Sequence, residues 1–200
     1  MPTPYRFLAL GDSYTIGTGV DPADSWPAQL VAQLRTRGVA ISDPIIIAQN
    51  GWTAGNLLKA LDETDISRNF DLVSLLIGVN DQYDGISPKE YHRNFKGLLK
   101  RVIELNVANP MQLITLSIPD WSVTPFAEGH DQVKISTQIE RFNTINRQET
   151  TLAGVHYIEI SYQAANDSNF FAEDGLHPSG TLYTAWVERL LPVVNEILQI

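Results

Sequence analysis

Five short runs of hydrophobic residues recur along the chain, and longer segments with helical periodicity separate them. The runs are 7–10, 45–48, 72–77, 111–118 and 155–160. Continuous apolar runs of this length are typical of β-strands that are buried on both faces of a sheet. Gly11, Gly78 and Pro119 directly follow three of the runs and favour turns there. The hydrophobic pattern therefore predicts five buried strands.

The segments between the runs carry hydrophobic residues at the three- and four-residue spacing of amphipathic helices. We expect helices over 26–37, 53–61, 87–105, 135–152 and 179–194. Ser87 and Glu90 form a capping box around Pro88, and Gly154 is a suitable stop for the fourth helix. Ser179 caps the last helix, in which Pro192 should remove one hydrogen bond or introduce a kink. The buried face of the fourth helix is expected to comprise Ile135, Ile139, Phe142, Ile145 and Leu152.

This alternation of strands and helices predicts an α/β fold with a five-stranded parallel sheet that helices cover on both faces. Right-handed crossovers then bring the carboxyl ends of all strands to one edge, where ligands bind in such folds. The unusual segments 11–19, 50–55, 78–84, 119–131 and 169–179 all come after strands. We therefore expect these five loops to converge on one site.

Length and charge narrow the classes of protein that fit. The chain has 200 residues, which suits a single domain over 1–200. Its net charge of −9 argues against a nucleic-acid partner and against docking on an anionic membrane. The absence of cysteine excludes disulfides and thiol nucleophiles, and no spacing of His, Asp or Glu suggests a metal site.

Features of membrane insertion and export do not occur in the sequence. No apolar run approaches the roughly 20 residues that a membrane-spanning helix needs. The first residues lack the charged start, long apolar stretch and small-residue cleavage site of a signal peptide. The sequence as it stands predicts a cytoplasmic protein, or a secreted one if a signal was removed from a precursor. It gives no information on the oligomeric state.

The loops at the expected edge carry the side chains of nucleophilic catalysis. Ser13 follows the first strand in Gly-Asp-Ser-Tyr, where backbone N–H groups can face a developing negative charge. A serine hydroxyl needs a base, and histidine is the usual one because imidazole titrates near neutrality. His177 can serve in this role, with Asp174 three residues upstream to orient its ring.

Two further residues can stabilise the oxyanion of an acyl-transfer intermediate. Asn80, in Gly-Val-Asn-Asp after the third strand, can donate a side-chain N–H. Gly51, in Asn-Gly-Trp, can bring its backbone N–H close because it has no Cβ. Each of these short motifs is also compatible with an ordinary turn. It is their combination that indicates a site for nucleophilic catalysis.

In four blocks of matching order and spacing, the sequence resembles the GDSL/SGNH hydrolase family. The blocks are Gly11-Asp12-Ser13, Gly51, Gly78-Val79-Asn80-Asp81 and Asp174-Gly175-Leu176-His177-Pro178. The resemblance implies a flavodoxin-like three-layer α/β/α sandwich. It implies Ser13 as nucleophile, His177 as base, Asp174 as its orienter, and an oxyanion hole from the Ser13 and Gly51 backbone and the Asn80 side chain. The chain departs from the pattern at Tyr14, where the family has Leu, and we expect Tyr14 to pack.

Other residues of these loops have supporting roles in this interpretation. The aromatic residues Trp52, Tyr83, Trp121 and Phe126 are candidates for lining an acyl or sugar pocket. Asp12 and Asp81 are expected to hold loops by accepting backbone N–H bonds, and His130 is a candidate for the rim. Gly17 and Gly19 should let the first loop turn.

The sequence therefore predicts a serine hydrolase that cleaves carboxylic esters through an acyl-enzyme on Ser13, without a metal or organic cofactor. Short-chain acyl or acetyl esters, including those of acetylated carbohydrates, fit a compact chain without an obvious lid. Acyl thioesters and lysophospholipids are alternative substrates. The alternative from another class is a non-catalytic binding or signalling module on the same topology. A phosphoryl receiver of this topology needs a lysine after the fifth strand, and no lysine follows Lys134.

Overall fold

Five strands form one parallel sheet in a computed structural model that describes residues 3–66, 69–105, 112–160 and 168–200. The strands are β1 (Phe7–Gly11), β2 (Ile45–Ala48), β3 (Leu72–Leu76), β4 (Leu113–Leu116) and β5 (His156–Ile158). Their order is β2-β1-β3-β4-β5, and Ala9 of β1 pairs with Ile46 of β2 and Ser74 of β3. The predicted α/β fold with a five-stranded parallel sheet is confirmed.

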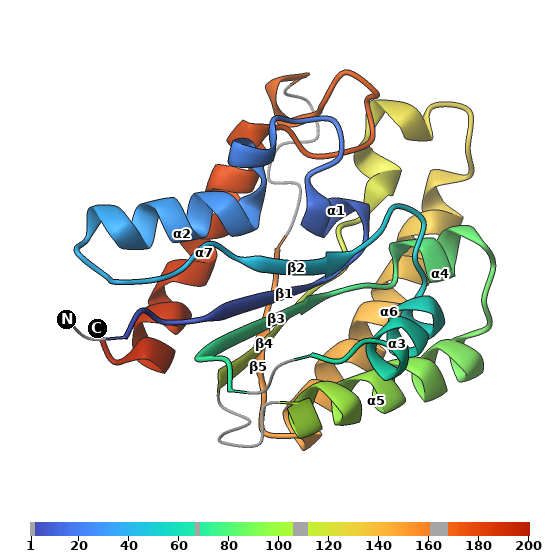
Figure 1. Cartoon of the computed structure of the whole chain (residues 1–200). Helices are drawn as coiled ribbons and strands as arrows, with labels where there is room; N and C mark the ends of the chain where they lie inside the picture. The colour runs from blue at the N-terminus through green and yellow to red at the C-terminus, as the bar shows by residue number, and fades with distance from the viewer. Residues whose placement is uncertain (1–2, 67–68, 106–111, 161–167) are drawn as a thin grey trace.

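Helices cover the sheet on both faces, which gives three layers (Figure 1). The helices are α1 (Ser13–Ile16), α2 (Trp26–Thr36), α3 (Ala54–Glu63), α4 (Val79–Tyr83), α5 (Pro88–Leu105), α6 (Gln132–Leu152) and α7 (Gly180–Leu198). α2 and α7 pack together on one face, and α3, α5 and α6 cover the other (Figure 1). Single turns of 3-10 helix lie in the loops: η1 (Pro22–Asp24), η3 (Trp121–Val123), η4 (Pro125–Ala127) and η5 (Ser168–Phe170).

The strands differ in burial according to their place in the sheet. Every residue of β1, β3 and β4 is buried, as the apolar runs predicted. The expectation of burial on both faces is wrong for the two edge strands. In β2, Ile45 and Ile46 are 44% and 39% exposed, and in β5 only Ile158 is buried. An edge strand has a neighbouring strand on one side only, so its apolar side chains are less covered.

The helix ends follow the local signals of the sequence. The Ser87 hydroxyl accepts the backbone N–H of Glu90 at 3.2 Å, and that of Ser179 accepts the N–H of Leu182 at 3.3 Å. Gly154, in a left-handed conformation, follows α6, and α7 continues through Pro192. The expectation that Leu152 lies on the buried face of α6 is wrong: it is 79% exposed, because in the last turn Thr150 faces the core and Leu152 lies on the opposite side of the helix.

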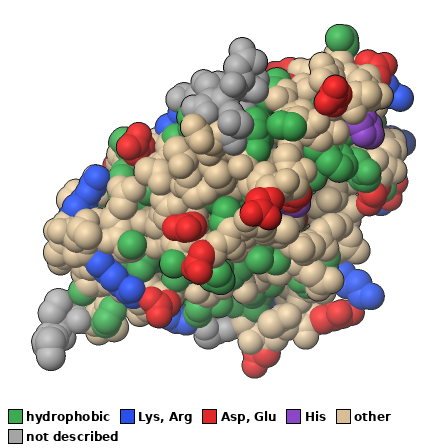
Figure 2. All heavy atoms as spheres, turned by 90° about the horizontal axis from the view of Figure 1, so that it is seen from above, with side chains coloured by type: hydrophobic (Ala, Val, Ile, Leu, Met, Phe, Trp, Pro, Cys, Tyr) green, Lys and Arg blue, Asp and Glu red, His purple; other side chains and the backbone are tan. Residues whose placement is uncertain are grey.

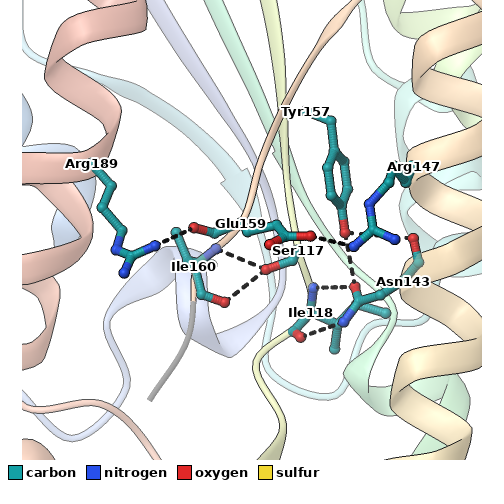
Figure 3. Close-up of polar contacts among 8 residues, drawn as sticks. All are labelled: Ser117, Ile118, Asn143, Arg147, Tyr157, Glu159, Ile160 and Arg189. Carbon is teal, nitrogen blue, oxygen red and sulfur yellow. Dashed lines mark hydrogen bonds and ion pairs between the residues drawn. The ribbon is translucent and has the colours of Figure 1, made fainter. Parts of the chain in front are cut away.

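Polar side chains join the carboxyl ends of β4 and β5 (Figure 3). The Ser117 hydroxyl donates to the Ile160 carbonyl at 2.7 Å and accepts the Ile160 N–H at 2.8 Å. The Asn143 amide on α6 accepts the N–H of Ile118 at 2.7 Å and donates to its carbonyl at 2.9 Å. These bonds satisfy backbone groups where the sheet ladder ends.

A polar cavity of about 260 Å³ lies beside these bonds, and three of the charged residues that line it, Arg147, Glu159 and Arg189, are joined to one another. Arg147 forms an ion pair with Glu159 and lies over the Tyr157 ring, and Arg189 donates to the Glu159 carbonyl at 3.3 Å (Figure 3). The arrangement fastens α6 and α7 to the end of β5, so we assign it a structural role.

Candidate active site

Ser13 opens the one-turn helix α1 directly after β1, and only 6% of its surface is exposed. Asp12 caps this turn through Oδ1, which accepts the Tyr14 N–H at 3.0 Å, and the N–H of left-handed Gly17 closes it on the Ser13 carbonyl. Gly11 is required before the turn, because a Cβ there would lie 2.4 Å from the Leu76 carbonyl oxygen. The sharp exit from a buried strand thus fixes the serine at the carboxyl edge.

Asp174 and His177 are joined by a hydrogen bond of 2.6 Å between Oδ2 and Nδ1. Oδ1 of Asp174 accepts the backbone N–H groups of Leu176 and His177, both at 2.9 Å. Gly175 adopts a positive φ of 67° inside this turn, which lets three successive residues bend around one carboxylate. With Nδ1 engaged, Nε2 is the ring nitrogen of His177 that is left for the cavity it lines with Ser13.

The surroundings of Asp174 favour its ionised form. Partial burial acts to raise the pKa of this carboxyl, but the hydrogen bonds from the His177 ring and from the His177 and Leu176 backbone outweigh it. The resulting pKa of Asp174 is below its usual value. The carboxylate can therefore hold the imidazole in one tautomer and stabilise it when it becomes protonated.

The loop that carries Asp174 and His177 is fastened to two other loops. Its own ends meet in an antiparallel bridge between Phe171 and Pro178. The carbonyl of Gly175 accepts the N–H of Phe126 at 3.0 Å, which attaches it to the loop after β4. Gly19, at φ 87°, passes so close that a Cβ would lie 2.8 Å from the Cβ of Ala172. The first loop and the last are thus packed against each other.

Gly51 and Asn80 line the same cavity of about 230 Å³ as Ser13 and His177. The Asn80 amide donates one hydrogen bond to the Trp52 carbonyl at 2.9 Å. An amide nitrogen carries two hydrogens, so the second remains for a ligand oxygen. Gly51 has a φ of 79°, and the neighbouring Asn50 accepts the Thr18 hydroxyl at 2.7 Å. The structure therefore brings together the expected nucleophile, base and oxyanion donors.

Asp12 and Asp81 are buried carboxyl groups that hold these loops, as expected. Oδ2 of Asp81 accepts the N–H of Ala54 at 2.8 Å, which fixes the start of α3. Burial raises the pKa of Asp81 to about 6, although its backbone hydrogen bonds oppose the change. Burial, assisted by the charge of Asp81, raises the pKa of Asp12 to about 8. At neutral pH the protonated acid therefore predominates at Asp12.

Aromatic side chains form one wall of the cavity. Tyr83, Trp121 and Phe126 lie along it with ring centroids 5.8 Å (Tyr83–Trp121) and 6.0 Å (Trp121–Phe126) apart. Viewed from above, hydrophobic side chains gather beside a histidine on the right of the molecule (Figure 2). Trp52 differs from the expectation: its side chain packs against the core, and within the described part of the chain it is not among the lining residues.

Several residues of the site carried no clear signal in the sequence. The indole N–H of Trp121 donates to Oε1 of Gln82 at 2.6 Å, a contact between two loops that no spacing indicates. Leu176 and Val79 also line the cavity, and both occupy variable positions within the recognised blocks. Tyr14 packs as expected: it is buried, with its ring centroid 5.5 Å from that of His177.

Within the described ranges, no group of three or more His, Cys, Asp or Glu side chains could hold a metal ion. None of the helices in those ranges is both long and apolar enough to cross a membrane.

Comparison with known proteins identifies a family that matches most of the chain and several solved structures with a similar fold. Residues 9–185 match the GDSL-like Lipase/Acylhydrolase family. Among curated proteins no match to the sequence is found. The solved structures with similar folds include an SGNH-hydrolase family esterase, AlinE4, at 20% identity and a TM-score of 0.66, covering 99% of this chain and 98% of that one.

Two further structures have named activities or inhibitors. The psychrotrophic esterase EstA from Pseudoalteromonas sp., inhibited by monoethylphosphonate, is 18% identical with a TM-score of 0.70, over 98% of this chain and 99% of that one. The acetylxylan esterase Axe2 from Geobacillus stearothermophilus is 18% identical with a TM-score of 0.72, over 95% of this chain and 94% of that one. At these identities the likeness establishes the fold.

Proposed function

The chain belongs to the GDSL-like lipase/acylhydrolase family and is a carboxylic ester hydrolase, and on this basis we propose that it hydrolyses short-chain esters, acetyl esters above all, through an acyl-enzyme on Ser13. One observation carries the proposal: His177, which is hydrogen-bonded to Asp174, lines the same small cavity as Ser13, Gly51 and Asn80. That cavity combines a nucleophile, an oriented base and oxyanion donors.

The proposed reaction has two halves that use the same groups. Ser13 Oγ attacks the ester carbonyl carbon while its proton passes to Nε2 of His177. The negative charge on the carbonyl oxygen is held by the backbone N–H groups of Ser13 and Gly51 and by the free N–H of Asn80. The intermediate expels the alcohol, which takes the proton from His177. Water then attacks the acyl-serine by the same route and releases the acid and free Ser13.

Cavity size supports a short acyl group. The space beside Ser13 is about 230 Å³, and Tyr83, Trp121 and Phe126 limit it on one side. A long acyl chain would have to extend past these rings, beyond the apolar lining of this cavity, where its apolar surface gains little. Lysophospholipids and long-chain acyl thioesters are therefore the less favoured substrates. The fold similarity to an acetylxylan esterase agrees with an acetyl ester, without identifying the alcohol.

Ser13→Ala tests this proposal with p-nitrophenyl acetate. We expect wild-type protein to hydrolyse the ester. We expect the variant to lose at least about 10³-fold in kcat/KM, because Ser13 is the only serine, threonine or lysine among the described residues that line this cavity. A phosphonate ester should label wild-type Ser13 covalently, which peptide mass spectrometry can locate. Folded wild-type protein that turns over no ester, or a variant that retains full activity, contradicts the proposal.

A further inference from the structure

A second cavity, of about 470 Å³, adjoins the first and shares Tyr83 and Trp121 with it. These two rings form a common wall, so a ligand that occupies the first cavity can continue across them into the second. Tyr83 is 57% exposed, although large aromatic side chains are usually buried more completely. The proposed mechanism uses none of the polar residues of this second cavity.

The orientation of the common wall is fixed by a chain of side-chain hydrogen bonds. Trp121 donates its indole N–H to Gln82 at 2.6 Å, and Gln82 donates its amide N–H to Oε1 of Gln138 at 2.9 Å. Because Gln138 engages its oxygen in this chain, its amide nitrogen keeps two hydrogens for a ligand in the cavity that it lines. Trp121, which lines the first cavity, is thereby connected to a polar group of the second cavity.

The remaining polar groups of the second cavity offer both donors and acceptors. Asp131, the N-cap of α6, and Lys134, in its first turn, line this cavity, and His130 precedes them. Asp131 uses Oδ1 to accept the backbone N–H of Lys134 at 3.0 Å, so Oδ2 is left to accept from a ligand. His130 lies close to parallel to Phe126, with centroids 5.8 Å apart, and extends the aromatic wall. The formal charges of Lys134 and Asp131 cancel.

We propose that the second cavity binds the alcohol part of the ester and that this alcohol is a neutral polyhydroxylated ring, a sugar. The inference rests on the proposed function, in which the acyl group occupies the first cavity. Each hydroxyl of a sugar both donates and accepts, which matches the mixture of amide, ammonium and carboxylate groups, and the C–H face of the ring matches the Tyr83–Trp121 wall.

Other ligand classes fit this cavity less well. A hydrocarbon chain would remove Lys134, Asp131 and Gln138 from water without replacing their hydrogen bonds. A phosphate or carboxylate would be attracted by Lys134 but repelled by Asp131 and by a chain with a net charge of −9. A neutral polyol avoids both penalties.

Two esters of matched ring size test the inference on wild-type protein. One is a monoacetylated methyl pyranoside, and the other is cyclohexyl acetate, which has a six-membered ring without hydroxyls. We expect kcat/KM to be at least tenfold higher for the sugar acetate. p-Nitrophenyl acetate serves as the reference that reports the proposed function itself.

Substitutions in the second cavity then locate the effect. Lys134→Met and Gln138→Ala should each lower kcat/KM for the sugar acetate at least fivefold more than that for cyclohexyl acetate. Lys89→Met is the matched control: Lys89 is exposed on α5 and lines neither of these two cavities. This variant should leave the ratio between the two substrates unchanged.

The outcomes separate this inference from the proposed function. Suppose that the protein hydrolyses p-nitrophenyl acetate, but that its kcat/KM for the sugar acetate is equal to or lower than that for cyclohexyl acetate. This result overturns the sugar subsite, and the proposed esterase function stands. Equal losses on both ring esters in Lys134→Met and Gln138→Ala overturn it as well. As a readout independent of catalysis, methyl pyranoside should change the tryptophan fluorescence of Ser13→Ala protein, and this change should be absent in Ser13→Ala/Trp121→Phe. No fluorescence change at saturating sugar counts against the subsite.

Discussion

Asp12 is a buried acid next to the proposed nucleophile, and it makes stability depend on pH. Its pKa is raised to about 8 in the folded protein, from 3.8 for an ordinary aspartate. Between these values the folded state holds a proton that the unfolded state has lost, so stability falls as pH rises. We expect Asp12→Asn, which is neutral at every pH, to gain at least about 1 kcal/mol relative to wild type between pH 4 and pH 8. Urea unfolding at both pH values measures this gain, and a constant difference would contradict the prediction.

Asp174 affects catalysis through His177. Asp174→Asn leaves an oxygen for the backbone N–H groups but removes the charge that stabilises a protonated imidazole. We expect kcat/KM for p-nitrophenyl acetate to fall by roughly 10³-fold or more. Glu173→Gln is the matched control, because it removes the same charge from the adjacent exposed position. Equal effects of the two substitutions would remove Asp174 from its proposed role.

At the residue scale, the sequence predicts side chains whose chemistry is local. Asp174 and His177 are three residues apart in one turn, so their contact follows from the spacing. The bond from Asn80 to the Trp52 carbonyl could not be predicted, because it joins loops that follow different strands. For the same reason the ring of Trp52 was assigned to the cavity, although the loop presents its backbone carbonyl to the site and its ring to the core.

The turn between β3 and α4 depends on the absence of a side chain at Gly78. A Cβ there would lie 2.5 Å from the Tyr91 hydroxyl and 2.6 Å from Cδ1 of Ile118, and the φ of 125° is unfavourable for other residues. We expect Gly78→Ala to destabilise the protein by about 2 kcal/mol or more. Gly38→Ala separates the steric clash from the strain of a positive φ, because Gly38 has a φ of 82° but nothing lies within 4 Å of the added carbon. Thermal unfolding that shows equal losses would exclude the packing contribution.

At the element scale, the hydrophobic pattern predicts strands and helices better than their burial. The runs at β1, β3 and β4 are buried because strands or helices cover them on every side. The equally apolar run of β2 is half exposed, since its order in the sheet, and not its composition, decides how much of it is covered. Strand order follows from crossover connections, which an isolated run of residues does not encode.

At the scale of the whole molecule, the net charge of −9 should influence which esters reach the site. A negatively charged ester, such as a succinate monoester, is repelled at long range, whereas a neutral ester of equal size is not. At low ionic strength we expect kcat/KM for the charged ester to be several-fold lower than that for the neutral ester. The ratio of these two kcat/KM values should approach one at about 0.5 M salt as the charges are screened. A ratio that does not change with salt would assign the discrimination to local contacts.

The placement of Ser13 after the first strand and of His177 in the loop before the last helix has a consequence for the life of the protein. A nascent chain carries the proposed nucleophile once β1 has been made, but it has no base until all five strands of the sheet have been translated. Products cut short before residue 177, by premature termination or by proteolysis, would therefore be inert toward esters. Hydrolytic activity therefore reports that a chain extends through residue 177, and a simple colour assay can distinguish such chains from products that end before it.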